Sequence, residues 1–390
     1  MLINQNYEVG EGDIMRMTAA VMYEQGLPAP YAESMPFQIE QVDLDGPGEG
    51  EVLVQVSAAG LCHSDLSQVA GLRKRTLPVV GGHEGAGVVV EVGAGVSHHK
   101  VGDHVVMTSG AGCGHCGQCV RLRPNLCDSV GTSRVAGVLP SGTRRLSLNG
   151  KPLYHYSGIS SFAQYAVCST EALVKADPQV PLDIAAMFGC AVVTGAGAVF
   201  NGAKVRPGDS VAIIGLGGVG LNSVMAAKLS GAWPIIGIDL LEAKFPLAAE
   251  LGCTHTLHAN DPDLIETVKD LTGGGVDFAF EVTAAKSAFK TAFDVTRKGG
   301  EIIGIGLGSY EDLHQYPHST LVAHEKVIRG SVMGSGIAER DIPRYLKYFL
   351  EGRLPVDRLM SGAMVFNDLN ANLDALDTGS VLRQILLPNG

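Results

Sequence analysis

The sequence predicts a mixed α/β protein of two domains, one a β-barrel and the other a doubly wound parallel sheet. Strand and turn patterns recur through the first half of the chain, and no long helical period appears before residue 175. From residue 211 onward helix and strand patterns alternate, which is typical of a parallel sheet covered on both faces. Short strand patterns return near the C-terminus. We therefore expect residues 1–191 and 335–390 to form the first domain and residues 192–334 to be inserted as the second.

The length and composition agree with two soluble cores. The chain has 390 residues, of which 46% are hydrophobic, and this is long for a single core. It carries 40 acidic against 29 basic residues, a net charge of −11, which excludes a generally basic surface for nucleic acid. No apolar run reaches the roughly eighteen residues that span a bilayer. Residues 1–15 lack the pattern of a secretory signal and read as a loosely ordered extension, so we expect a cytoplasmic protein.

The expected elements of the first domain are short strands joined by turns rich in glycine and proline. They are Thr18–Tyr23, Phe37–Val42, Glu51–Ala58, Gly87–Val92 and His104–Thr108. Asp128–Ser161 reads as a polar insert of turns, after which Phe162–Cys168 resumes the strand pattern. Helix begins with Leu182–Gly189 and Gly195–Gly202.

A glycine-rich turn follows the buried strand Val211–Ile214. Its glycines have the spacing G-x-G-x-x-G, and the turn consists of Gly215, Leu216, Gly217, Gly218, Val219 and Gly220. In a dinucleotide site the first glycine makes the tight turn, the second admits the pyrophosphate, and the third packs helix against strand. The N-terminus of the next helix offers free N–H groups to the phosphates. The alternative is a glycine-rich turn of some other α/β sheet.

An acidic residue closes the next strand, Ile235–Ile238. Asp239 stands where it can accept hydrogen bonds from a ribose diol, and its charge would repel a 2′-phosphate, so it favours NAD over NADP. The later elements alternate and then return to the first domain. They are Lys244–Gly252, Ile265–Thr272, Val276–Glu281, Phe289–Val295, Gly300–Ile305, Ile342–Glu351, Ala363–Phe366 and Arg383–Leu387.

Four of the eight cysteines are clustered as C-x-x-C-x-x-C with a fourth after seven residues. They are Cys113, Cys116, Cys119 and Cys127. Four thiolates close the shell of one ion, so this spacing favours a structural, tetrahedral zinc site. An iron–sulfur cluster and a disulfide pair are the alternatives.

A second group has one open position. Cys62, His83 and Cys190 would supply three ligands and leave the fourth to water or substrate, as in catalytic zinc sites. From spacing alone the question stays open, because a buried cysteine commonly packs as a small apolar residue and a histidine is more often a core residue than a ligand.

Taken together, these residues resemble the zinc-containing medium-chain alcohol dehydrogenases. The family's motifs occur in its order between Thr18 and Leu387: GLCHSDL, GGHEGAG, the four-cysteine group, FGC…TG, GLGGVGL and the Asp239/Lys244 pair. The insert Pro140–Tyr165 is most similar to the long-form branch, which includes liver-type and glutathione-dependent formaldehyde dehydrogenases. The resemblance implies a GroES-like catalytic domain, a Rossmann coenzyme domain, NAD, two zinc ions per chain and a homodimer formed through the strands near Gly300–Val332.

The resemblance also implies roles for individual residues. Cys62, His83 and Cys190 would bind the catalytic zinc, Glu84 would approach it during ligand exchange, and Asp65 would orient the zinc-bound imidazole. Ser64 would take the proton of the alcohol. The nicotinamide and its ribose would be bound by Thr194, Val282, Ile305, Leu307 and Met333, the pyrophosphate by His63 and Arg383, and the adenosine ribose by Asp239 and Lys244. Phe162 would be an aromatic wall of the substrate pocket.

The implied function is reversible oxidation of a primary or secondary alcohol by hydride transfer to NAD. A nicotinoprotein with tightly bound NAD, an S-(hydroxymethyl)glutathione dehydrogenase and a non-catalytic NAD-binding protein are the alternatives. Leu66 and Ser67 stand where several relatives place a proton-relay histidine, which leaves the proton exit open. Residues 72–75 (Leu-Arg-Lys-Arg) and Gly131 replace residues that meet the glutathione adduct in that branch. The three basic residues favour an anionic or polar-tailed alcohol, or else belong to a solvated loop.

Overall fold

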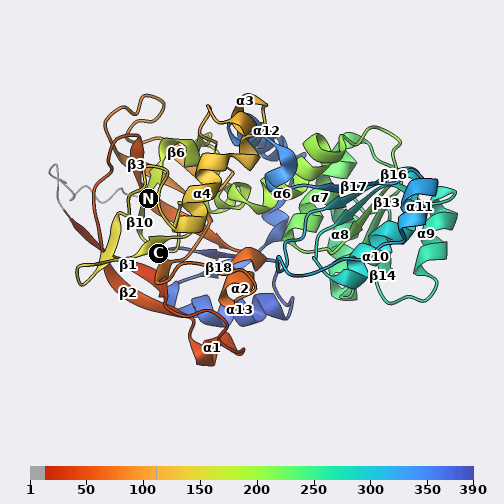
Figure 1. Cartoon of the computed structure of the whole chain (residues 1–390), viewed down its shortest axis with the longest axis horizontal. Helices are drawn as coiled ribbons and strands as arrows, with labels where there is room; N and C mark the ends of the chain where they lie inside the picture. Colours follow the sequence, from red (N-terminus) through yellow and green to blue (C-terminus); the bar gives the residue numbers. More distant parts are fainter. Residues whose placement is uncertain (1–13, 111) are drawn as a thin grey trace.

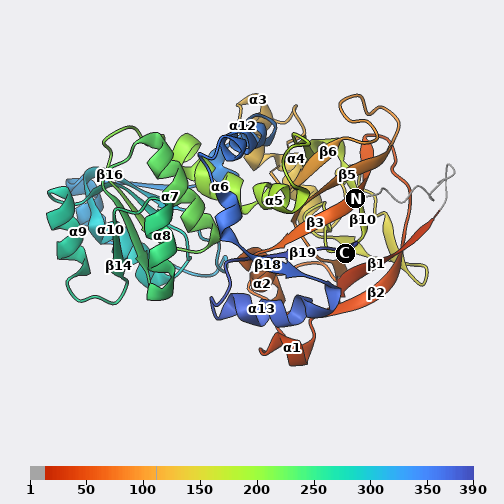
Figure 2. The same cartoon turned by 180° about the vertical axis from the view of Figure 1, so that it is seen from behind.

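The computed structural model describes residues 14–110 and 112–390. The expected N-terminal extension falls almost entirely in residues 1–13, outside the described part. The chain forms two lobes side by side, a β-rich lobe and an α/β lobe (Figures 1 and 2). This confirms the predicted fold class.

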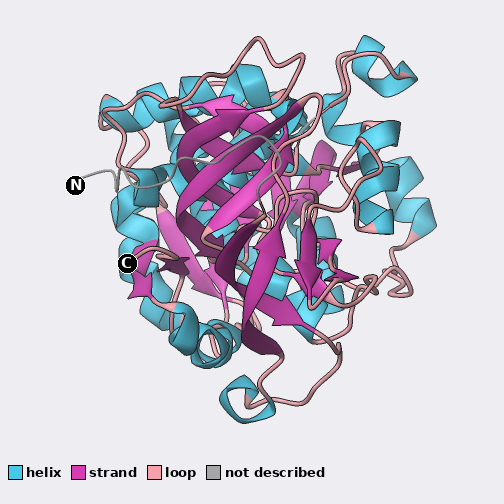
Figure 3. Cartoon of the chain, turned by 90° about the vertical axis from the view of Figure 1, so that its left-hand side faces the viewer, coloured by secondary structure: helices cyan, strands magenta, loops and turns pink. Residues whose placement is uncertain are grey.

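Two sheets build the β-rich lobe, and seen from its end they form a twisted wall with helices around it (Figure 3). The first sheet has the order β8(Lys151–Pro152), β7(Leu146–Leu148), β2(Phe37–Leu44), β1(Met15–Met22), β4(Val79–Val80), β9(Tyr154–His155). Antiparallel pairing runs along the whole of β1 and β2, from Met15 opposite Leu44 to Met22 opposite Phe37. The inward residues of β1 are buried in the apolar core.

The second sheet contains the central strand of the lobe, β3(Glu51–Leu61). Its order is β11(Leu173–Lys175), β6(His104–Thr108), β5(Glu84–Val92), β3, β19(Arg383–Leu386), β18(Met360–Met364), with β10(Tyr165–Ser169) also paired to β3. Strand β19 lies antiparallel to β3, with Gln384 opposite Leu61. The C-terminal segment therefore returns to the first lobe. The domain boundaries near residues 191 and 335 stay a prediction.

The α/β lobe contains one parallel sheet. Its order is β14(His255–His258), β13(Ile235–Asp239), β12(Val211–Ile214), β15(Val276–Glu281), β16(Thr296–Gly304), β17(Val327–Gly330). The helices beside it are α7(Gly218–Ser230), α8(Phe245–Leu251), α9(Leu264–Thr272), α10(Lys286–Val295) and α11(His318–Ala323). Strand β12 is buried throughout, which explains its unbroken apolar sequence.

The remaining helices cover the first lobe or join the two. They are α1(Tyr31–Ser34), α2(His63–Val69), α3(Gly117–Val120), α4(Asp128–Ala136), α5(Leu182–Ala186), α6(Ala191–Gly197), α12(Ala338–Leu350) and α13(Leu369–Asp377). Short 3-10 turns are η1(Pro124–Leu126), η2(Thr170–Ala172), η3(Met187–Gly189), η5(Glu242–Lys244), η6(Met333–Ser335), η7(Val356–Leu359) and η8(Phe366–Asp368), and η4(Ala198–Ala203) is a π-helical turn. A common apolar core crosses between the lobes, since Ala58 and Val106 belong to the same cluster as Val211 and Phe280.

Helix α4 corrects the sequence analysis, which expected Asp128–Ser161 to consist of turns. Helix α4 carries no marked apolar face and contains Gly131 and Thr132, both weak helix formers. The sequence therefore has no helical periodicity that could have predicted it. The helix ends at Gly137, whose φ of 70° provides a left-handed cap.

Within the described residues no single helix is long and apolar enough to cross a membrane. One bent pair, Leu182–Gly189 with Ala191–Ala203 at 55°, passes that test by length and composition only.

Candidate active site

Three residues far apart in sequence meet where the two lobes join. Cys62 follows β3 and precedes α2, His83 comes just before β5, and Cys190 lies between η3 and α6. All three are buried, and their ligand atoms lie within 4.8 Å of one another. The structure thus brings together the three residues that the sequence alone could not assign to a metal site.

The donor atoms of this group suit a metal ion. The Nδ1 atom of His83 is hydrogen-bonded to Asp65 Oδ1 at 2.9 Å, whereas its Nε2 atom is buried and has no hydrogen-bond partner in the described part of the chain. A hydrogen bond with the Cys190 thiol lowers the pKa of Cys62, which favours the thiolate form that binds a metal ion. One imidazole nitrogen and two sulfurs, with a carboxylate behind the imidazole, form the usual donor set of a three-ligand zinc site.

Glu84 and Arg383 connect the metal group to the glycine-rich turn. Their side chains form a buried ion pair, and burial raises the pKa of Glu84 to about 7. A Cβ atom added to Gly218 would lie 2.8 Å from Cδ of Arg383, so the arginine stem packs against that turn. The proposed pyrophosphate contact of Arg383 is compatible with this position.

The aromatic ring beside the metal group is Tyr156, which the sequence analysis did not single out. Its ring centroid lies 5.5 Å from that of His83, and its hydroxyl donates a hydrogen bond to the main-chain oxygen of Ser64 at 3.3 Å. Phe162, which was expected there, is fully buried in the barrel core and packs edge-on against Phe37 at 5.7 Å. Both rings come from the same insert, and only the chain path decides which one reaches the site.

The glycine-rich turn has the conformation that a dinucleotide requires. Gly215 has a φ of 103°, which an L side chain rarely adopts. A Cβ atom at Gly217 would meet nothing within 4 Å, so this side of the turn is open to a ligand. A Cβ atom at Gly220 would lie 1.8 Å from the oxygen of Gly215, and only glycine lets α7 pack so closely. These observations match the three glycine roles in order.

Asp239 is fixed beside this turn. Its Oδ2 atom accepts a hydrogen bond from the main-chain N–H of Leu216 at 2.7 Å, and its Oδ1 atom accepts one from Leu241 at 2.9 Å. Lys244 Nζ lies 3.1 Å from Oδ2. The carboxylate is therefore held in place before any ribose arrives.

The other residues expected to bind coenzyme lie around the junction of the lobes. Val282 follows the end of β15, and Ile305 and Leu307 follow the end of β16, at the carboxyl edge of the parallel sheet, where nucleotides bind in such folds. Thr194 on α6 lies close to Met333, with Oγ1 3.8 Å from Sδ. His63 begins α2, and burial lowers its pKa.

The four clustered cysteines form a separate centre. The ligand atoms of Cys113, Cys116, Cys119 and Cys127 lie within 4.8 Å of one another, and all eight cysteines of the chain are free. Main-chain N–H groups point at the sulfurs, from Cys113 to Cys127 at 3.3 Å and from Cys116 to Cys113 at 3.4 Å. The disulfide alternative is excluded, and four sulfurs around one point fit a closed structural zinc site.

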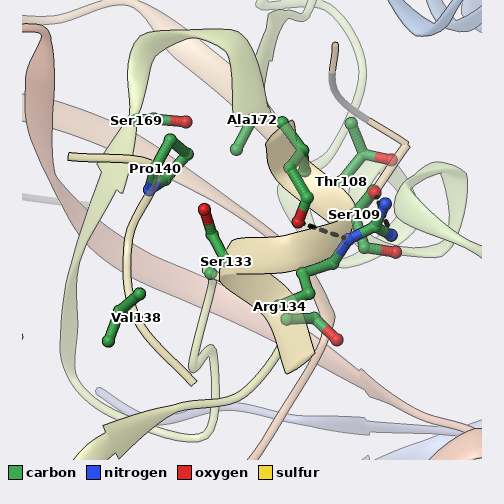
Figure 4. Close-up of a pocket in the computed structure, with 11 residues that line it drawn as sticks. Thr108, Ser109, Ser133, Arg134, Val138, Pro140, Ser169 and Ala172 are labelled. Atoms are coloured by element: carbon green, nitrogen blue, oxygen red, sulfur yellow. Dashed lines mark hydrogen bonds between the residues drawn. The ribbon is translucent and has the colours of Figure 1, made fainter. Parts of the chain in front are cut away.

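A small pocket lies beside α4 (Figure 4). Arg134 lies in its wall and donates a hydrogen bond to the main-chain oxygen of Ser109 at 2.7 Å. The lining residues are Thr108, Ser109, Val130, Ser133, Arg134, Val138, Pro140, Ser157, Gly158, Ser169 and Ala172. It contains none of the three proposed metal ligands, so we do not equate it with the substrate site.

A β-barrel lobe with a Cys/His/Cys group, joined to a parallel sheet with a nucleotide-binding turn, defines a zinc-dependent dehydrogenase. The chain belongs to the zinc-dependent alcohol dehydrogenase family, in its glutathione-dependent formaldehyde dehydrogenase-like branch. Residues 48–179 match the alcohol dehydrogenase GroES-like domain, and residues 218–351 match the zinc-binding dehydrogenase domain. It is therefore an oxidoreductase with zinc and NAD as cofactors.

Named relatives and solved structures agree with this assignment. The chain is 36% identical over 377 residues to S-(hydroxymethyl)glutathione dehydrogenase of Synechocystis sp., covering 95% of this chain and 100% of that protein. It is 34% identical over 385 residues to alcohol dehydrogenase class-3 of Cereibacter sphaeroides, covering 96% of this chain and all of that protein. The benzyl alcohol dehydrogenase structure from Acinetobacter calcoaceticus superposes with a TM-score of 0.89 at 32% identity, covering 96% of this chain and 99% of that chain.

Proposed function

We propose that this protein oxidises a small alcohol to the aldehyde or ketone, reversibly, with NAD as the hydride acceptor. The observation that carries the proposal is the buried Nε2 atom of His83, which has no hydrogen-bond partner in the described structure and belongs to the same compact group as the sulfurs of Cys62 and Cys190. Leaving such an atom unsatisfied costs free energy unless a ligand binds it.

The chain's own residues would bind, align and deprotonate the alcohol. When bound, zinc would supply Lewis acidity towards the hydroxyl group and NAD would accept the hydride. Ser64 would take the hydroxyl proton from the first turn of α2, and its main-chain oxygen is fixed by the Tyr156 hydroxyl. Ser67 donates its own hydrogen bond to the main-chain oxygen of His63 at 2.8 Å, so it does not extend the relay in this geometry.

Two classes of alcohol are suggested by the names of the relatives. The Synechocystis relative is named for S-(hydroxymethyl)glutathione, and the Acinetobacter structure for benzyl alcohol. In this chain Gly131 and residues 72–75 depart from the pattern that meets the glutathione adduct, and Tyr156 places an aromatic ring beside His83. We therefore propose a compact primary alcohol as substrate, with the glutathione adduct as the second candidate.

The test compares the wild-type protein with Cys190→Ser in NADH-absorbance assays on benzyl alcohol and S-(hydroxymethyl)glutathione. We expect Cys190→Ser to abolish turnover and to lower the zinc content from two ions per chain to one, while NADH binding is kept. Cys253→Ser is the matched control, because Cys253 is a buried cysteine of the α/β lobe that packs near Gly237. Normal turnover by Cys190→Ser would overturn the assignment. NAD that copurifies and does not exchange would instead support the nicotinoprotein alternative.

We also propose that two chains form a homodimer through β17. This strand lies at the edge of the parallel sheet and all four of its residues are exposed, with Val327 at 39% and Ile328 at 38%. An exposed apolar edge strand is a template for pairing with another chain. Ile328→Lys should shift the mass measured by light scattering from dimer to monomer, whereas a wild-type monomer would refute the proposal. The cytoplasmic location stays a prediction.

A further inference from the structure

Three arginines gather beside the proposed substrate site. Arg73 lies with Nη2 3.4 Å from the main-chain oxygen of Ser64. The guanidinium of Arg75 lies over the Tyr156 ring, 5.5 Å from its centroid. Arg134 reaches in from α4, and burial, together with the charge of Arg75, lowers its pKa. Positive charge is thus concentrated next to the proton-accepting serine in a protein whose net charge is −11.

No acidic partner balances this charge within residues 14–110 and 112–390. Elsewhere buried or half-buried arginines meet carboxylates, as Arg145 meets Glu51 at 2.8 Å. No ion pair of Arg73, Arg75 or Arg134 occurs among the described residues, and the Nε atoms of Arg73 and Arg75 are buried without a hydrogen-bond partner. Removing part of a guanidinium from water without an anionic partner is unfavourable, so we expect the partner of these half-buried arginines to come from outside the chain.

Hydrogen bonds with the side chain of Gln25 fix the loop that carries these arginines. Gln25 donates from Nε2 to the main-chain oxygens of Gln68 at 2.7 Å and Arg73 at 3.1 Å. Its Oε1 atom accepts the main-chain N–H of Arg75 at 2.8 Å. Lys74, between the two arginines, is exposed. A fully solvated loop would not need this clamp, and its three cations would not differ in exposure, whereas Arg73 and Arg75 are half-buried and Lys74 is exposed.

We propose that the substrate is a compact alcohol that also carries an oxyanion, a carboxylate or a phosphate, bound by Arg73 and Arg75. The inference rests on the proposed function, since it names the substrate class of the same site. Two ring contacts of 5.5 Å each, His83 to Tyr156 and Tyr156 to Arg75, separate the metal group from the guanidinium. These two contacts set an upper limit on the distance that the substrate has to span, and a spacer of the size of one benzene ring falls within that limit.

Arginine suits this task better than lysine. Its planar fork donates two parallel hydrogen bonds to a carboxylate or phosphate, and its charge persists at every working pH. Arg134 donates one hydrogen bond to Ser109 and Arg73 donates one to Ser64, so Arg75 offers the full fork, Arg73 its remaining N–H groups and Arg134 mainly positive potential. Substrates that lack the anion would leave the half-buried Arg73 and Arg75 without an anionic partner, which gives selectivity as well as affinity.

The experiment uses the full chain loaded with zinc and NAD, and three probes with the same benzylic hydroxyl. They are 4-(hydroxymethyl)benzoate, its neutral methyl ester and 4-(hydroxymethyl)phenyl phosphate. We expect kcat/KM to be higher for at least one anionic probe than for the ester by about tenfold to a hundredfold, the range of a hydrogen bond to a charged group. The preferred probe identifies the anion.

The variants localise the effect. Arg75→Ala and Arg73→Ala should each reduce the anion-to-ester ratio of kcat/KM about tenfold or more, chiefly through KM, because the contact lies away from the reacting atoms. Arg75→Lys should recover only part of the ratio, since it restores charge without the fork. Lys74→Ala is the matched control in the same loop, and its ratio should equal that of the wild type.

Other outcomes overturn the inference in distinguishable ways. Turnover of the ester with no preference for either anion would refute the anion site and leave the proposed function standing. A higher kcat/KM for S-(hydroxymethyl)glutathione than for both anionic probes would refute the compact substrate. Should no probe be turned over, terephthalate binding to the NADH complex still decides the anion site. Equal affinities of wild type and Arg75→Ala would then refute it.

Discussion

The carboxylate of Asp65 accepts a hydrogen bond from Nδ1 of His83 at 2.9 Å, and its second oxygen accepts the main-chain N–H of Cys62 at 3.0 Å. One buried side chain therefore fixes two of the three proposed metal ligands. The first contact sets the imidazole tautomer so that Nε2 is left to the metal, and the second fixes the turn that carries the sulfur. The metal group is thus arranged by the fold before any ion binds.

Asp65→Asn should weaken zinc binding at this site by about 10- to 100-fold, as is usual when the partner of a metal-bound histidine is changed. The amide keeps the size of the carboxylate but has a single acceptor oxygen, so it cannot receive both hydrogen bonds. Chelator competition on the purified protein measures the affinity. Glu33→Gln, an exposed acid on α1, is the control. Equal zinc affinity in Asp65→Asn and wild type would mean that Asp65 does not support the site.

The segment with the four clustered cysteines, residues 112–138, should depend on its metal ion for local order. Its core consists of Cys119, Cys127 and Val130, with the other two cysteines packed against it, while Leu122 remains 74% exposed. So small an apolar cluster does not hold a loop, and a structural zinc site supplies the missing folding free energy.

Cys116→Ser should therefore speed amide hydrogen exchange in residues 112–138 and leave the parallel sheet unchanged. Hydrogen exchange with mass spectrometry gives both regions in one measurement. Cys168→Ser, at a buried cysteine of β10 outside this segment, serves as the comparison. Unchanged hydrogen exchange in residues 112–138 would mean that the metal ion has no structural role there.

Exchange of Asp239 for glycine should relax the preference for NAD over NADP. At the ribose position that we propose for it, the carboxylate would repel a 2′-phosphate, and it pairs with Lys244, which lies 3.1 Å away. Without it, like-charge repulsion disappears and Lys244 becomes free to meet the phosphate, so the NAD/NADP ratio of kcat/KM should fall about tenfold or more. Glu242→Gln, a nearby exposed acid, should keep the wild-type ratio. A ratio unchanged in Asp239→Gly would remove its proposed role at the ribose.

Local patterns predicted the parts of this fold that depend on neighbours in sequence. The glycine spacing and the apolar run of β12 indicated the nucleotide turn, because the positive φ of Gly215 and the close contact of Gly220 with the oxygen of Gly215 both arise within one strand–turn–helix unit. The four cysteines are also close in sequence. Cys62, His83 and Cys190 are not, and only their resemblance to a family, or the fold itself, could join them.

What the sequence could not decide depends on tertiary contacts. Tyr156 and Phe162 are six residues apart in one insert, and the pairing of β9 with β4 determines which ring faces His83. For the arginines of the 72–75 loop, the sequence left open both a contact with an anionic substrate and a solvated loop. Their partial burial depends on a loop conformation that Gln25, some fifty residues away, fixes by hydrogen bonds. Such contacts leave no local pattern.

A buried histidine outside the metal site should make stability fall in mild acid. His155 on β9 is 2% exposed, and burial lowers its pKa from 6.5 to about 4, with a smaller opposing effect from Glu51. Its Nε2 atom accepts the main-chain N–H of Arg145 at 3.2 Å, which requires the neutral ring.

The unfolded chain therefore binds a proton at higher pH than the folded chain, and stability is lost as the pH falls from 6.5 towards 4. Linkage gives a loss of about 2 kcal/mol between pH 7.5 and 5 from this residue. His155→Gln keeps an acceptor but does not titrate, so urea unfolding should show a correspondingly smaller loss over that interval. An identical pH dependence in both proteins would show that His155 is not protonated on unfolding.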